Sequence, residues 1–183
     1  RTDIPAFYTE WFFNRLKQCF LYVRNPMNYH QVSEVTLKPE VIDCIVFWTK
    51  DPANILKAGA ASPYAFYFQI TVNAYSHQVE RRVPDKNKVI GAFQTLSREI
   101  GPERTLWRYD PILLTTQMDT DYHLKSFASL AERLEGYTRQ CTISFMDMYK
   151  KIERNMRDIN YLPMHHDTIL KMAEQLSIIS RRH

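Results

Sequence analysis

An arginine and an aspartate stand two residues apart inside the apolar stretch TLWRYDPILL, at 105–114. In a β-strand this spacing places Arg108 and Asp110 on one face, opposite Trp107 and Tyr109. The planar guanidinium group suits a carboxylate or a phosphate, and a neighbouring carboxylate fixes its orientation. The pair is therefore either a structural clamp or part of a site for an anionic ligand, and the sequence leaves both open.

Polar residues also end three further apolar stretches, at 41–50, 65–73 and 141–147. The residues concerned are Trp48, Lys50, Gln69, Thr71, Asn73 and Asp147. Because the carboxyl ends of parallel strands meet at one edge of a sheet, these side chains are expected to gather there. Such a gathering is either a ligand site or an internal network of ion pairs and hydrogen bonds.

We predict from this gathering a site for a small anionic molecule. The candidate catalytic residues are Lys50, Asp110 and Asp147. The candidate substrate-binding residues are Arg1, Asp3, Arg24, Asn25, Trp48, Gln69, Thr71, Asn73 and Arg108. Arg1 and Asp3 repeat the Arg-x-Asp spacing, as if a first strand ended there. Arg24 and Asn25 lie in a turn-like segment and serve either a ligand or the cap of the turn.

Strands and helices alternate along the chain. Near-continuous hydrophobicity in the four stretches is typical of parallel strands covered on both faces. The third stretch covers 104–112, and Pro111, which cannot donate to a ladder, is expected to mark where its strand gives way to a loop. Helical periodicity predicts helices at 5–20, 86–100, 120–135 and 167–181, with a short helix after KDPANILK. The expected helix caps are Asp85, either Asp119 or Asp121, and Gly136 as a stop.

This alternation predicts a parallel α/β fold with right-handed crossovers. The chain has no GxGxxG or GxxxxGK[ST] motif, which counts against a nucleotide-binding doubly wound sheet. Polar strand ends favour a TIM-type (β/α) barrel instead. A full barrel needs about 250 residues, so we expect residues 1–183 to be a single, incomplete barrel domain that is truncated at both ends.

Composition excludes several classes of protein. With 45% hydrophobic and 24% charged residues the chain is typical of a globular domain, and it has neither a membrane-length apolar run nor a signal peptide, so a cytoplasmic location is expected. Three scattered cysteines, Cys19, Cys44 and Cys141, indicate reduced core thiols, and the adjacent His165 and His166 lack metal-ligand spacing. A net charge of +4 permits a phosphorylated ligand or nucleic acid without requiring either.

Six segments together resemble the bacterial domain-of-unknown-function family 1848. They are RTDIPAFYTEWFFNRL, VRNPMNYHQVS, DCIVFWTKDP, FYFQITVN, IGPERTLWRYDPILL and CTISFMDMYKKI, in this order along the chain. The likeness extends from Arg1 to about Ile152. This chain departs from the family at Asp51, where asparagine is more common, and at Tyr29, where the family has a second proline.

The resemblance implies a barrel protein whose full-length members continue into a Cys-rich C-terminal segment. The C-x3-C-x2-C-like spacing of that segment is similar to the iron–sulfur signature of radical S-adenosylmethionine enzymes. No cofactor is thus expected within this chain, although an iron–sulfur cluster is expected in a full-length form. The family has no assigned activity, and two hypotheses follow: an enzyme that acts on an anionic substrate at the strand ends, or a non-catalytic module for a phosphorylated metabolite or nucleic acid.

Overall fold

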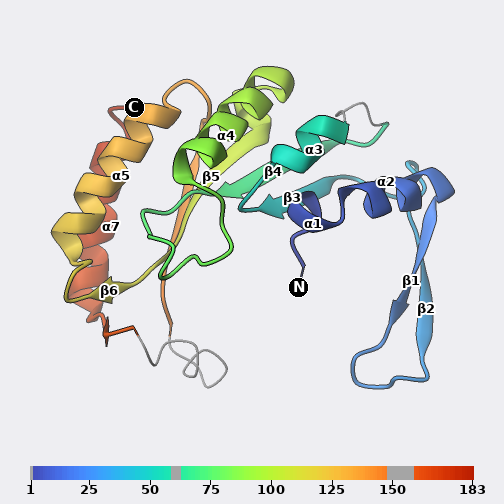
Figure 1. Ribbon diagram of the computed structural model, residues 1–183, viewed down its shortest axis with the longest axis horizontal. Helices are drawn as coiled ribbons and strands as arrows, with labels where there is room; N and C mark the ends of the chain where they lie inside the picture. Colours follow the sequence, from blue (N-terminus) through green and yellow to red (C-terminus); the bar gives the residue numbers. More distant parts are fainter. Residues whose placement is uncertain (1, 59–62, 148–158) are drawn as a thin grey trace.

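A four-stranded parallel sheet lies at the centre of the computed structural model, which describes residues 2–58, 63–147 and 159–183 (Figure 1). Its strands, in spatial order, are β3 (Ile45–Thr49), β4 (Phe66–Thr71), β5 (Thr105–Ile112) and β7 (Cys141–Phe145). Each strand lies within one of the four apolar stretches, so the prediction of these strands and of their parallel pairing is confirmed.

The predicted TIM-type barrel is wrong. β3 and β7 are the two edges of an open sheet, and no strand of the described ranges joins them. The remaining strands form separate antiparallel pairs, β1 (Phe20–Arg24) with β2 (Val32–Thr36) and β6 (Leu114–Thr115) with β8 (Tyr161–Leu162). Apolar strands with polar ends occur in any parallel α/β sheet, so this pattern does not report whether a sheet closes.

Most predicted helices are confirmed, and their caps explain where they begin. In α4 (Lys86–Ile100) the Asp85 carboxylate accepts the Asn87 N–H at 2.9 Å. In α5 (Thr120–Leu134) Asp119, rather than Asp121, accepts the Tyr122 N–H at 2.8 Å. The structure also contains the two remaining predicted helices, α3 (Ala53–Ala58) and α7 (His166–Ser180). α3 lies largely within KDPANILK rather than after it.

The single helix predicted at 5–20 is divided in two. The observed helices are α1 (Ile4–Phe7) and α2 (Thr9–Gln18). Tyr8 separates them with φ −135° and ψ 24°, which lie outside the helical range. Apolar spacing predicted one continuous stripe because periodicity does not register a local break of this kind.

We predicted that Pro111 marks the end of its strand, but β5 continues to Ile112. The pairing of β5 with β7 shifts register between Tyr109 and Ile112. Proline has no N–H to give to a ladder, and an irregular position in the pairing is where that loss is tolerated. The Tyr75 hydroxyl donates to the Pro111 carbonyl at 2.7 Å and accepts the Leu113 N–H at 2.9 Å, which secures the end of the strand.

The two faces of the sheet differ in burial. On the covered face Phe68 is 2% exposed and Trp107 stacks on Phe127 of α5 with ring centroids 4.7 Å apart. α3 and α4 lie along one side of the sheet (Figure 1). The opposite, open face carries the partly exposed alternate residues of the inner strands, namely Tyr67, Gln69, Thr71, Leu106, Arg108 and Asp110. The prediction that both faces are covered is therefore wrong for the described residues.

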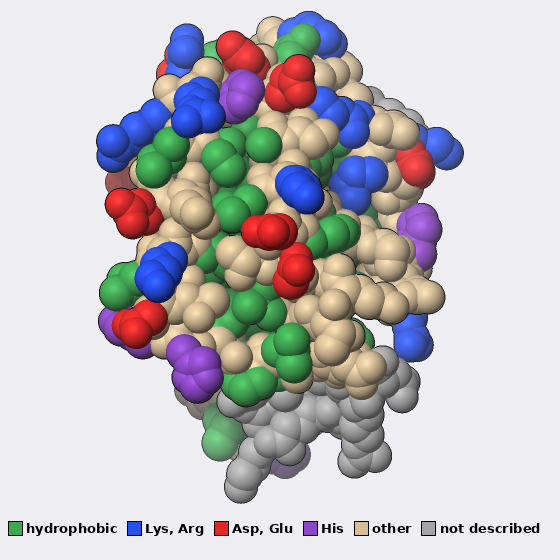
Figure 2. Space-filling view, turned by 90° about the vertical axis from the view of Figure 1, so that its left-hand side faces the viewer, with side chains coloured by type: hydrophobic (Ala, Val, Ile, Leu, Met, Phe, Trp, Pro, Cys, Tyr) green, Lys and Arg blue, Asp and Glu red, His purple; other side chains and the backbone are tan. Residues whose placement is uncertain are grey.

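α7 packs against α5 at one side of the sheet (Figure 1). It buries Met172 and Leu176 but leaves Leu170 and Ile178 about half exposed. Hydrophobic side chains accordingly reach the surface among charged ones on this side of the molecule (Figure 2). No helix in the described ranges is both long and apolar enough to span a bilayer.

A buried hydrogen-bonded chain connects α5 to the end of β5. The Tyr109 hydroxyl lies 2.8 Å from His123 Nδ1, and His123 Nε2 lies 2.9 Å from the Leu113 carbonyl. Since a carbonyl only accepts, Nε2 carries the proton and Nδ1 accepts from Tyr109. Burial lowers the pKa of His123 and raises the pKa of Tyr109, so both groups are neutral in the core.

This neutral histidine gives the fold a pH dependence. The pKa of His123 is lower in the folded than in the unfolded state, so the unfolded state binds more protons as the pH falls below about 6.5. We expect the free energy of unfolding to be greatest above this pH and to fall below it. His123→Gln retains one donor and one acceptor, and should flatten the decline by at most about 1.4 kcal/mol per pH unit. Urea unfolding from pH 7.5 to 5.5 measures the free energy of unfolding at each pH. An equal decline with pH in wild type and His123→Gln would contradict the assignment of a neutral His123.

Candidate functional site

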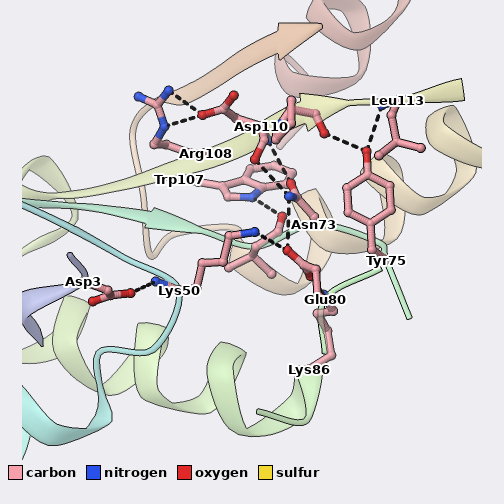
Figure 3. Close-up of polar contacts among 12 residues, drawn as sticks. Asp3, Lys50, Asn73, Tyr75, Glu80, Lys86, Trp107, Arg108, Asp110 and Leu113 are labelled. Carbon is pink, nitrogen blue, oxygen red and sulfur yellow. Dashed lines mark hydrogen bonds and ion pairs between the residues drawn. The ribbon is translucent and has the colours of Figure 1, made fainter. Parts of the chain in front are cut away.

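Arg108 is held on the open face by three residues from three strands (Figure 3 shows the Asp110 contact). Its Nε and Nη2 atoms donate to Asp110 Oδ2 at 2.9 and 2.5 Å, and its Nη1 donates to Gln69 Oε1 at 2.5 Å. The guanidinium carbon lies 4.6 Å from the centroid of the Trp48 ring. β3, β4 and β5 thus each contribute one contact that fixes the plane of the guanidinium group.

Asp110 is occupied on both carboxylate oxygens. Oδ2 accepts from Arg108, and Oδ1 accepts from the hydroxyl of Ser144 on β7. A carboxylate held in this way is suited to orienting Arg108 rather than to taking a proton from a ligand. The structure therefore supports a positioning role for Asp110, which the sequence proposed as catalytic. Ser144 was not predicted, because a serine inside an apolar strand carries no distinctive spacing.

Asn73 connects the ends of β4 and β5 through backbone groups. Its Oδ1 accepts the Asp110 N–H at 2.8 Å, and its Nδ2 donates to the Asp110 carbonyl at 2.9 Å. The side-chain amide thereby pairs with the backbone of β5 as another strand residue would. Only 1% of Asn73 is exposed, so its side-chain hydrogen bonds are satisfied within the protein, and its predicted contact with a substrate stays a prediction.

A buried carboxylate and two lysines form a second cluster beside Asn73 (Figure 3). Glu80 accepts from Lys50 Nζ on one oxygen and from Lys86 Nζ at 3.1 Å on the other. The Glu80 side chain is 7% exposed, whereas those of Lys50 and Lys86 are 40% and 25% exposed. Asn73 Nδ2 lies 3.5 Å from Glu80 Oε1, which joins this cluster to the Arg108 cluster. Glu80 was missed because it stands in a charged loop with no periodic pattern.

Asp3 caps a helix and does not end a strand, so the predicted first strand at this position is wrong. Its Oδ1 accepts the Ala6 N–H at 3.0 Å, and its Oδ2 accepts the Lys50 N–H at 3.0 Å and the Thr49 hydroxyl at 3.1 Å. The Arg-x-Asp spacing reflects a helix N-cap here, a role that aspartate fills as readily as a strand end. Arg1 lies outside the described residues.

A hollow of about 420 Å³ lies on the open face beside Arg108. Trp48 and Gln69, the two neighbours of Arg108, form part of its lining, together with Ile4, Pro5, Val46 and Tyr67. This volume is within the range of small-molecule sites, which combine mostly apolar walls with a few polar groups. Trp48 and Gln69 thus contact Arg108 and line this cavity, whereas the Arg108 side chain itself is not part of the lining. The predicted role of these residues in binding a ligand stays a prediction.

Four other predicted residues lie elsewhere or contribute less. Arg24 and Asn25 are on the β1–β2 hairpin, which projects away from the sheet (Figure 1). There Arg24 Nη1 donates to the Tyr29 carbonyl at 2.8 Å, and Asn25 Oδ1 accepts the Met27 N–H at 2.9 Å, so of the two predicted alternatives the structure supports the turn cap. Thr71 ends β4 in register with Arg108. Asp147 is exposed beyond β7 and makes no hydrogen bond to another described residue.

The described residues do not fit an iron–sulfur cluster. Across 2–58, 63–147 and 159–183 no group of three or more His, Cys, Asp or Glu side chains could hold a metal ion. The three cysteines are free, and burial raises the pKa of Cys141 to about 12, which disfavours the thiolate that a metal requires. Cys44 is exposed, contrary to its predicted core position. The cluster was expected in a Cys-rich segment of full-length members and not on these residues, so it stays a prediction.

Comparison with known proteins yields one match. A family model described as domain of unknown function (DUF1848) matches residues 1–183. Neither the curated proteins nor the solved structures contain a protein that matches the chain. The description of the family assigns no activity, so the function has to be inferred from the geometry of the site.

The contact between Asn73 and the Asp110 backbone should be important for stability. Asn73→Ala leaves a partly buried N–H and carbonyl without their partners, and we expect the free energy of unfolding to fall by about 1–3 kcal/mol. Asn87→Ala is the matched control, because Asn87 is exposed and its side chain contacts Arg133 on the surface. Denaturant unfolding followed by circular dichroism measures both variants. Similar losses of unfolding free energy in the two variants would contradict the importance of the Asn73 contact for stability.

Proposed function

This chain belongs to the family described as domain of unknown function DUF1848, and we propose that the open face of its sheet binds a small anionic molecule beside Arg108. The orientation of Arg108 is the observation that carries the proposal. Three of its five N–H groups have acceptors, on Asp110 and Gln69, which leaves one on Nη1 and one on Nη2 without an acceptor among the described residues. These two groups are available to a carboxylate or a phosphate.

The immobilisation of Arg108 favours binding over a purely structural role. An arginine that serves only to neutralise an aspartate needs one partner, whereas this guanidinium group is also fixed by Gln69 and by the Trp48 ring. Fixing the side chain before a ligand arrives reduces the conformational entropy that binding would otherwise cost. The 15% exposure of the Arg108 side chain keeps it in reach while limiting competition from water.

The walls of the hollow indicate the rest of the ligand. Trp48 and Tyr67 offer aromatic surface, and Ile4 and Val46 offer aliphatic surface. Planar apolar groups pack favourably on such walls, while Gln69 supplies a polar contact close to Arg108. The ligand class that fits best is a small molecule with a planar apolar part and one carboxylate or phosphate group. A phosphorylated metabolite falls within this class.

Arg108→Lys tests the anion contact, because it keeps the charge opposite Asp110 and removes the planar fork. Phenyl phosphate is the probe, and we expect the substitution to weaken its binding by at least about tenfold. Arg139→Lys is the matched control, since Arg139 is 67% exposed and pairs with Glu103 on the surface. Isothermal titration calorimetry measures the affinities. Equal affinities in wild type and Arg108→Lys would contradict the proposal.

The hollow itself can be tested through tryptophan fluorescence. Trp48 and Trp11 are 39% and 48% exposed, whereas Trp107 is 2% exposed. Phenyl phosphate seated on Trp48 should reduce the quenching of wild-type fluorescence by acrylamide. Trp48→Phe should abolish this protection, and Trp11→Phe should preserve it. Protection that survives in Trp48→Phe would place the probe outside the hollow.

A further inference from the structure

We propose that Lys50 forms an imine with a carbonyl group of the bound molecule, which makes the substrate an aldehyde or a ketone. That the substrate is also anionic rests on the proposed function of Arg108. The inference combines three observations: the row that Lys50 shares with Arg108 across the sheet, the carboxylate that contacts Lys50, and the second lysine on that carboxylate.

Lys50 and Arg108 flank the same residue of β4. The pairing of β3 with β4 ends at Thr49, opposite Ile70, and Lys50 follows directly at the level of Thr71, which pairs with Arg108. Neighbouring strands are about 4.8 Å apart, which puts the backbones of Lys50 and Arg108 about 10 Å from each other across β4. A small molecule that extends from the hollow over Thr71 would come within reach of both long side chains. Trp48, two residues before Lys50, contacts Arg108 and lines the hollow.

Glu80 provides a proton acceptor for the Lys50 ammonium group. The Lys50 Nζ atom donates to Glu80 Oε1, so the proton can pass along an existing hydrogen bond (Figure 3). The carboxylate is 7% exposed and is held by Asn73 as well, which keeps it fixed near the amine. This geometry meets the requirement that a nucleophilic amine lie within hydrogen-bonding distance of its base.

The reaction needs no partner beyond the carbonyl compound. Lys50 gives a proton to Glu80, and the neutral amine attacks the carbonyl carbon, so that a C–N bond forms and the C=O π bond breaks. A proton then moves from the attacking nitrogen to the oxygen, which becomes the hydroxyl of a carbinolamine. Glu80 returns its proton to that hydroxyl, the C–O bond breaks, and water leaves. The product is a protonated imine on Lys50, and Glu80 is again a carboxylate.

Lys86 explains how the buried carboxylate tolerates these changes. It donates to the other oxygen of Glu80 at 3.1 Å, so Glu80 keeps a hydrogen-bond donor throughout and a cationic partner once it is again a carboxylate. Lys50 is the reactive lysine of the two because its side chain is 40% exposed, against 25% for Lys86. Only Lys50 also lies in the row with Arg108.

Reductive trapping tests the inference on the intact chain. The probes are pyridoxal 5′-phosphate, an anionic aldehyde, and pyridoxal, which lacks the phosphate group; each is reduced with borohydride and located by peptide mass spectrometry. We expect Lys50 to be labelled by pyridoxal 5′-phosphate at least tenfold faster than the exposed Lys88 and Lys125, and pyridoxal to label Lys50 more slowly. Phenyl phosphate should compete with the labelling of Lys50 alone.

Variants separate this inference from the anion site. Glu80→Gln should slow the labelling of Lys50 at least tenfold without changing that of Lys88, and circular dichroism checks that the variant is folded. If phenyl phosphate binds as proposed but Lys50 is labelled no faster than Lys88 and Lys125, the imine is overturned and the anion site stands. If Lys50 is labelled preferentially but equally fast in Arg108→Lys, the imine stands and the role of Arg108 is overturned.

Discussion

The pairing of the Asn73 side chain with the Asp110 backbone is the contact on which the arrangement of the site depends. It joins β4 and β5 at the point where Asp110 must be placed to orient Arg108. The same amide reaches Glu80, so one buried residue fixes the positions of two charged clusters. A side chain that replaces strand backbone holds an irregular stretch as firmly as a ladder would, and this is needed where β5 shifts register before Ile112.

Burial of apolar side chains on one face of the sheet stabilises the fold enough for the opposite face to be polar. Aromatic rings fill the covered face, including Phe68, Phe93, Trp107 and Phe127, and their burial supplies much of the hydrophobic stabilisation. The open face can then hold charged groups, provided that each has a partner. On this face Arg108 is matched by Asp110, and in the loop between β4 and α4 the buried Glu80 is matched by two lysines. Partnered charges of this kind are tolerated at low exposure because their desolvation is offset by direct hydrogen bonds.

Local signals in the sequence predicted the elements and part of the site. The caps Asp85 and Asp119 and the alternation of β5 follow from short-range geometry, so Arg108 and Asp110 were placed correctly on one face. Closure of the sheet depends on contacts between distant strands, which periodicity does not contain, and the predicted barrel was wrong for that reason. Glu80 was missed because its burial results from three partners, two of them 30 and 7 residues away in the chain, rather than from a local pattern.

The two charged clusters are suited to different tasks because their partners are distributed differently. Both carboxylate oxygens of Asp110 accept hydrogen bonds, one from Arg108 and one from Ser144, so the orientation of Arg108 is fixed. Its remaining N–H groups are available to donate to a ligand. Lys50 shares a single carboxylate with Lys86, so Glu80 would keep a lysine partner when Lys50 reacts with a carbonyl group. A rigid, permanently charged group is what recognition of an anion requires, and a group whose charge can change is what covalent chemistry requires. Their common row across β4 is the reason to treat them as parts of one site.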